Sequence, residues 1–264
     1  YGGVPSAFLA RYGLAPFFRT MGIFLDNTGL IDIGNWFAST IGTFIFGVIL
    51  ISLLIYIFSR GMRGFFRIQN VLIIFAIIST LLSALVFIGK DQAAVMAAFN
   101  SFLGPISGNP DLAQYVLDSA HEAGFTVEAF SLKNTLLPMT WIYLNLSFMS
   151  SSAYIGSEVK NARRIQLWSM PVTLLVVGLG VLITVLLVGK SAGYDFLGSL
   201  TWADPAAMGL SSTPLYTELA SYLSNNIVIA FLITFGFIFW SYAWLPGQIL
   251  NGSRNILAYA IDGL

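Results

Sequence analysis

The amino-acid sequence predicts an all-α membrane protein, a multi-pass helical bundle forming a single transmembrane domain over residues 1–264. Composition is the first observation: 57% of the residues are hydrophobic, only 9% are charged, and the mean hydropathy is +0.82. A soluble domain carries about 25% charged residues. Length is the second observation: five apolar stretches each reach the roughly 20 residues that a helix needs to cross bilayer hydrocarbon. We therefore expect the lipid bilayer to surround much of the chain.

The predicted spans cover residues 39–59, 68–89, 134–157, 166–189 and 226–250. None of these stretches contains Asp, Glu, Lys, Arg or His. Buried helices of a large soluble protein are the alternative, but charge-free runs of this length are typical of membrane helices. Short helices are also predicted in the polar segments between spans, at 92–103, 110–124 and near 213–223.

Residues 1–38 are mixed in character and predict short helices outside the membrane. The charges of Arg11 and Arg19 argue against deep burial of this segment. The alternative is that residues 5–25 form the end of a preceding span. The chain begins with Tyr1 rather than Met, and we expect it to be a fragment of a longer protein.

Basic residues are concentrated at one set of span ends. They are Arg60, Arg63, Arg67, Lys160, Arg163, Arg164 and Arg254. The opposite loops hold three lysines and most of the acidic residues. Loops rich in Lys and Arg stay in the cytoplasm, so the predicted cytoplasmic segments are 60–67, 158–165 and 251–264. The predicted external segments are 1–38, 90–133 and 190–225.

The third predicted span contains a serine-rich run near its middle. The run consists of Ser147, Phe148, Met149, Ser150, Ser151 and Ser152. Serine competes for backbone hydrogen bonds and weakens a helix interior. A broken helix at membrane depth is tolerated where it lines a cavity or is buried in protein, and transporters build binding sites in this way. Packing of small residues between membrane helices is the alternative interpretation.

Several functional classes are disfavoured by composition. The formal net charge is zero, which gives no sign of a nucleic-acid partner. The chain has no cysteine and a single histidine, His121, so thiolate and multi-histidine metal sites are excluded. The spans supply hydroxyls but no convergent carboxylates or bases. We therefore predict no catalytic residues, no enzymatic activity and no cofactor.

Three motifs give the chain a resemblance to a known family. They are FFRIQNVL at 65–72, SEVKNARR at 157–164 and SRNILAYAIDGL at 253–264. In this order and spacing they resemble motifs of amino acid–polyamine–organocation superfamily permeases. The first resembles the link into that family's fifth span. The second resembles its EVKNPRR-type turn after the sixth span, and the third its SRVLYAMARDGL-type run after the eighth span. The resemblance covers roughly 39–264, as spans four to eight.

The resemblance implies a partial inverted-repeat amino-acid transporter fold, with the substrate held where the first and sixth spans unwind. It implies a secondary active transporter of amino acids or related amines in the plasma membrane, working by alternating access. Residues 147–152 would bind the substrate. The alternatives are a membrane-embedded scaffold or receptor-like protein without transport activity, and an intramembrane enzyme.

The resemblance also suggests gating residues and bears on the coupling ion. Tyr143 and Leu144 are the gating candidates. Phe148 and Ser150 depart from the family's Gly-aromatic-Glu element, and Ala76 stands where some proton-coupled members carry a lysine. The coupling ion, sodium or a proton, therefore stays open. The hydroxyls that could serve sodium are those of Ser79, Thr80, Thr234 and Ser241.

Overall fold

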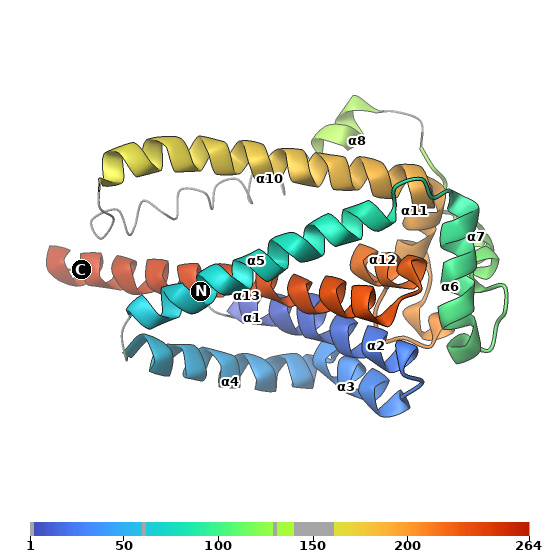
Figure 1. Cartoon of the computed structure of the whole chain (residues 1–264), viewed down its shortest axis with the longest axis horizontal. Coiled ribbons are helices and arrows are strands. Elements are labelled where there is room, and N and C mark those ends of the chain that lie inside the picture. Colours follow the sequence, from blue (N-terminus) through green and yellow to red (C-terminus); the bar gives the residue numbers. More distant parts are fainter. Residues whose placement is uncertain (1–2, 60–61, 129–130, 140–160, 264) are drawn as a thin grey trace.

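The computed structural model describes residues 3–59, 62–128, 131–139 and 161–263. All regular secondary structure in these ranges is helical. Figure 1 shows long helices that run along the longest axis of the molecule, with shorter helices gathered at one end.

Four long helices dominate the described chain. They are α4 (Thr40–Ser59), α5 (Met62–Val86), α10 (Ala162–Ala192) and α13 (Ile227–Asp262). Each contains a stretch long and apolar enough to cross a membrane. These helices lie over four of the five predicted spans. The remaining prediction, 134–157, falls mostly outside the described residues, apart from its first six positions.

Apolar side chains of these helices point outward as well as inward. At most 28% of any candidate span is buried within the chain, and the value for α10 is 11%. Leu167 and Trp168 on α10, for example, are 68% and 65% exposed. A helix that is apolar on all sides is typical of a membrane span. This exposure disfavours the alternative of helices buried inside a soluble protein.

The N-terminal segment forms one helical rod. Helix α1 (Gly3–Phe8), the π-helical turn η1 (Leu9–Leu14) and α2 (Ala15–Phe24) follow one another while the joining residues keep helical backbone angles. The prediction of short separate helices over 1–38 misses this continuity, whereas the alternative, the end of a preceding span over 5–25, covers nearly the same residues as the rod. Pro16 lies at the junction of η1 and α2, where the hydrogen-bond pattern changes from π-helical to α-helical.

Helix α3 (Thr28–Ala38) turns back along α2, and α4 continues in the same direction after Ser39. Glycines allow the close approach: a Cβ on Gly34 would come within 2.6 Å of the Arg19 side chain, and one on Gly22 within 2.7 Å of Ile31. The rod and α3–α4 therefore form an antiparallel helical hairpin.

Helices α5 and α13 pack against each other in antiparallel fashion at Gly236. A Cβ at this position would lie 2.5 Å from the carbonyl oxygen of Phe75 and 2.6 Å from Cβ of Ser79. One turn further along, the indole Nε1 of Trp240 donates to the carbonyl oxygen of Ala76 at 3.0 Å. The absence of a side chain at Gly236 lets the two backbones approach, as in other membrane helix pairs.

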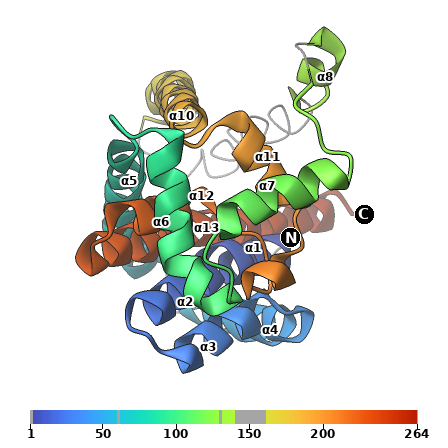
Figure 2. The same cartoon turned by 90° about the vertical axis from the view of Figure 1, so that its right-hand side faces the viewer.

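Short helices cover one end of the long ones (Figure 2). They are α6 (Gln92–Ser107), α7 (Leu112–Glu122), α11 (Tyr194–Trp202), the 3-10 turn η3 (Pro205–Met208) and α12 (Tyr216–Ser224). We call this group the cap. It confirms the helices predicted at 92–103, 110–124 and near 213–223. A smaller helix, α8 (Leu132–Leu136), follows the cap segment.

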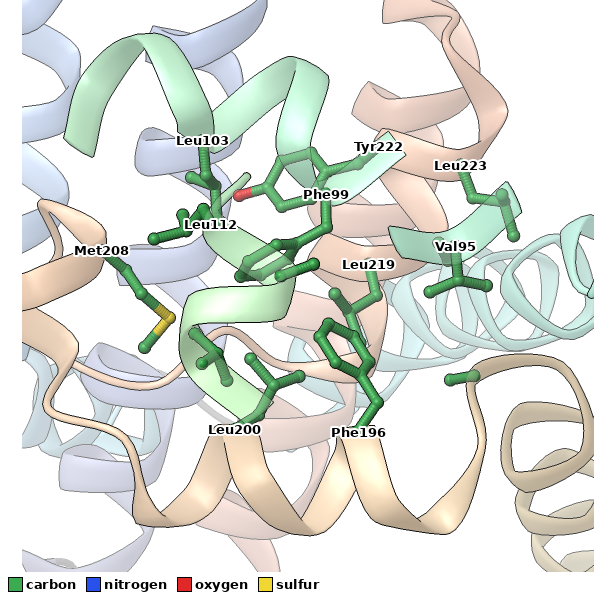
Figure 3. Packing of buried hydrophobic residues seen from close by; sticks show 14 of the residues in the cluster. Val95, Phe99, Leu103, Leu112, Phe196, Leu200, Met208, Leu219, Tyr222 and Leu223 are labelled. Atoms are coloured by element: carbon green, nitrogen blue, oxygen red, sulfur yellow. The ribbon is translucent and has the colours of Figure 1, made fainter. Parts of the chain in front are cut away.

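The cap has its own hydrophobic core (Figure 3). Phe99 of α6 meets Phe196 of α11 edge to face, with ring centroids 5.4 Å apart, and both side chains are fully buried. His121 lies on the outside of the cap, where its Nε2 is 2.9 Å from Oδ1 of Asp195. These contacts join the two segments of the cap, 91–122 and 194–224, into one unit.

The two ends of the molecule differ in character. Helix α5 begins, α10 begins and α13 ends at the end opposite the cap (Figure 1). The basic residues that flank these helix ends are thus separated from the acidic residues of the cap. This separation agrees with the one predicted from charge, and the assignment of the cap to the external side stays a prediction.

Candidate functional site

The predicted substrate-binding segment, 147–152, and the predicted gating residues Tyr143 and Leu144 lie outside the described residues. The predicted helix break in the third span therefore stays a prediction.

The four hydroxyls predicted for sodium lie on α5 and α13. Thr80 Oγ1 donates to the carbonyl oxygen of Ala76, and Thr234 Oγ1 donates to that of Ala230 at 2.8 Å, so both bond back to the preceding turn. Ser79 Oγ donates across the helix interface to the carbonyl oxygen of Ile233 at 2.5 Å. Ser241 is half-buried on α13.

Three of the four hydroxyls thus donate to backbone carbonyls, two within their own helix and Ser79 across the α5–α13 contact, and Thr80 Oγ1 also accepts from the indole of Trp240. These bonds bring Ser79 close to the turn of α13 that holds Thr234. A sodium site at these oxygens stays a prediction.

A different group of polar residues lies buried where α2 meets α12. It consists of Arg19, Thr20, Thr217, Glu218 and Tyr222, and we call it the α2–α12 cluster. Each of these residues is at most 1% exposed. Arg19 and Glu218 are the two buried charged side chains in the part of the chain that the structure describes.

Arg19 is held by three acceptors. Its Nη2 donates to Oε2 of Glu218 at 2.8 Å, and its Nη1 donates to both the hydroxyl and the carbonyl oxygen of Ser212, at 2.6 Å and 3.2 Å. The expectation that Arg19 avoids deep burial is therefore wrong. Its charge is tolerated because a carboxylate and two further oxygens replace the water it loses.

Glu218 serves the ion pair and the start of α12 at the same time. It is the third residue of the helix, and its Oε2 accepts a hydrogen bond from the backbone N–H of Leu215 at 2.9 Å. A carboxylate at this position is half of a capping box and also interacts favourably with the helix dipole. The helix start thus fixes the carboxylate that receives Arg19.

Tyr222 lies one turn further along α12, and its ring stacks on Phe102 of α6. Burial raises the pKa of its hydroxyl well above the usual value, and the negative charge of Glu218 raises it further. Arg19 and the nearby Thr20 hydroxyl oppose this rise in pKa, although Thr20 and Tyr222 make no hydrogen bond of good geometry. Tyr222 is thus kept neutral beside the ion pair.

The cluster was missed from sequence, although a signal for it exists. Arg19 is the single charged residue between Arg11 and Asp26, and Glu218 is the single one between Asp204 and Arg254. Isolated charges in long apolar surroundings usually pair with one another. That rule suggests that Arg19 and Glu218 each form an ion pair, but it does not indicate that they pair with each other.

Chemically, the cluster offers an ion pair and hydroxyls but no metal site. Within the described ranges, no three residues of the His, Asp or Glu type come together as metal ligands.

The described residues therefore define an all-helical protein with four helices able to cross a membrane and a polar cluster under a helical cap. Neither models of known protein families, nor curated proteins, nor solved structures match this chain.

Proposed function

We propose that this chain is part of a secondary active transporter that moves amino acids or related amines across the plasma membrane. The observation that supports the proposal is the position of the three family-like motifs. The described parts of all three lie at the end of the long helices opposite the cap (Figure 1). A common side is what the resemblance to amino acid–polyamine–organocation permeases requires, because each motif follows or precedes a span on the cytoplasmic face.

The proposed mechanism is alternating access around a site in the third predicted span. Residues 147–152 would leave the helix and present free backbone N–H groups and hydroxyls to the substrate. The N-terminus of the inner half-helix carries partial positive charge, which suits a substrate carboxylate. Tyr143 and Leu144 would close the site.

The full-length protein in proteoliposomes tests the proposal. Uptake of labelled amino acids and amines is measured with an imposed sodium or proton gradient at matched membrane potential. We expect saturable uptake of at least one substrate. A scaffold or receptor would give none with any substrate, and an intramembrane enzyme would convert its substrate without accumulating it.

The same assay addresses the coupling ion. Position 76 is occupied by alanine, which has no titratable group, and its carbonyl oxygen accepts from Trp240 of α13. We therefore propose that sodium drives uptake or that the protein exchanges substrates. Uptake driven by the proton gradient alone, with no effect of sodium, contradicts this part of the proposal.

A further inference from the structure

The α2–α12 cluster contains polar atoms that its own side chains do not pair. Arg19 Nε, Thr20 Oγ1, Glu218 Oε1 and the Tyr222 hydroxyl are all buried and have no hydrogen-bond partner within the chain. They come from adjoining positions: Arg19 and Glu218 are in direct contact, Thr20 follows Arg19 on α2, and Tyr222 lies one turn after Glu218 on α12. Thr217 Oγ1, next to Glu218, is buried and unpaired as well.

Such a concentration of unpaired atoms is unusual. Roughly nine-tenths or more of buried polar groups in proteins have a partner, which is either protein or ordered water. Leaving a buried donor or acceptor unpaired costs stability, and the cost is greater for charged groups. Arg19 and Glu218 are both charged, so the unpaired sides of this ion pair favour an additional ligand.

The charges around the site select a neutral ligand. A cation that approaches Glu218 Oε1 meets the guanidinium of Arg19, whose Nε–H is a donor. An anion that approaches Arg19 Nε meets the carboxylate of Glu218. A molecule that both donates and accepts satisfies the two groups together, and it also suits the hydroxyls of Thr20 and Tyr222. Water has these properties, and buried water typically makes about three such bonds.

We propose that Arg19, Thr20, Glu218 and Tyr222 enclose ordered water, which joins α2 to the cap helix α12. The water accepts from Arg19 Nε, donates to Glu218 Oε1 and exchanges hydrogen bonds with the two hydroxyls. Because Glu218 also caps α12, this water belongs to the contact that holds the cap on the N-terminal hairpin. The inference does not depend on transport activity.

Radiolytic footprinting of the full-length protein tests the proposal directly. Hydroxyl radicals formed from a bound water modify the side chain beside it, even where bulk solvent has no access. We expect Tyr222 to take up isotopically labelled oxygen after irradiation in labelled water. Phe99 and Phe196, which are equally buried but lie in the apolar core, serve as internal controls and should remain unmodified.

The sign of a stability change gives a second test. Removing a buried hydroxyl that has no partner is neutral or stabilising, whereas removing one bonded to a buried water leaves that water with an unmade hydrogen bond and costs stability. We expect Tyr222→Phe to lower the Tm of the full-length protein and Tyr115→Phe, at an exposed position on α7, to leave it unchanged. Absence of label on Tyr222, or a Tyr222→Phe variant at least as stable as the parent, overturns the proposal.

Discussion

Arg19 and Glu218 lie 199 residues apart in the sequence, yet they form a fully buried ion pair with a nitrogen–oxygen distance of 2.8 Å. The pair joins the N-terminal hairpin to the first turn of α12. Two distant segments of an otherwise apolar chain are therefore held together by charge, at the end of the bundle where the cap begins.

Removing one partner of this pair should destabilise the protein strongly. Arg19→Met leaves a buried carboxylate with one donor fewer, and Glu218→Leu leaves a buried guanidinium and an uncapped helix. We expect each variant to lose about 3–5 kcal/mol of unfolding free energy. The double variant should lose clearly less than the sum, because no charge is then left unpaired. Equilibrium unfolding of the full-length protein in detergent measures all three.

Arg11→Met is the matched control for this cycle. Arg11 lies on the same helical rod but is exposed, and its Nε makes one long hydrogen bond to Thr43 Oγ1, at 3.3 Å. We expect a change within about 1 kcal/mol. Additive losses in the Arg19→Met/Glu218→Leu variant would show that the two residues are not energetically coupled.

Alkaline pH should weaken the fold through Tyr222. Its pKa in the folded protein is raised by burial and by Glu218, so the folded state holds the proton more tightly than the unfolded state does. The contribution is complete below the unfolded pKa of about 10 and is lost as the pH rises from there toward the folded pKa. Stability measured from neutral to alkaline pH should fall above about pH 10.

The variant Tyr222→Phe shows how much of the loss of stability at alkaline pH is due to Tyr222. The variant should show a shallower decline in stability at alkaline pH. Tyr216, whose pKa is also raised by burial, remains in the variant and contributes in the same direction. Identical slopes in parent and variant would exclude Tyr222 as a source of the alkaline sensitivity.

Sequence patterns predicted those parts of the fold that depend on local information. Helix α4 begins and ends within one residue of the stretch predicted at 39–59. Amphipathic segments predicted α6 and α7. The long rod from Gly3 to Phe24 was predicted only as the alternative, a span over 5–25, because its glycines, its two prolines and its charges favoured short separate helices.

The α2–α12 cluster depends on non-local information. In the sequence, Arg19 is evidence for exposure, because an unpaired guanidinium is costly to bury. Burial of Arg19 becomes favourable only when a carboxylate lies beside its guanidinium. The carboxylate that does so, Glu218, belongs to a distant segment that was predicted as an external loop. Pairing between such distant residues cannot be read from periodicity or spacing.

Close packing at Gly236 provides a test of the α5–α13 contact. An added methyl group would lie 2.5 Å from the carbonyl oxygen of Phe75, so the helices must move apart. The bond from Ser79 to Ile233 would then weaken. We expect Gly236→Ala to cost about 1–3 kcal/mol in unfolding free energy.

Gly247→Ala is the control on the same helix. A Cβ at Gly247 meets nothing within 4 Å, and alanine is the better helix former by about 1 kcal/mol. This variant should be as stable as the parent or slightly more stable. If Gly236→Ala is as stable as Gly247→Ala, the substitution affects helix propensity alone and the close approach of the two helices does not limit stability.

The predicted orientation can be tested with single cysteines, since the chain contains none and any cysteine elsewhere in the full-length protein can first be replaced by serine. Thr126→Cys lies in the exposed segment that follows α7, and Ala260→Cys lies in the exposed last turns of α13. In intact cells that make the full-length protein, an impermeant thiol reagent should label only the first. Ala260→Cys should react after permeabilisation. The reverse pattern would invert the topology.

The serine-rich run gives the most direct test of the proposed binding site. Leucine at position 150 or 151 should fill the proposed cavity and remove a hydroxyl, while a membrane helix accepts leucine well. We therefore expect Ser150→Leu and Ser151→Leu to keep their expression and Tm but lose most substrate binding and uptake. Ser169→Leu, at an exposed position on α10, is the matched control and should transport normally.

Binding and transport are best measured separately in these variants. Equilibrium binding of labelled substrate to purified protein reports the site itself, whereas uptake also reports the conformational cycle. Loss of both in Ser150→Leu, with both retained in Ser169→Leu, supports a substrate site at 147–152. Normal binding and uptake in Ser150→Leu and Ser151→Leu would remove this segment from the site and favour simple packing of small residues between helices.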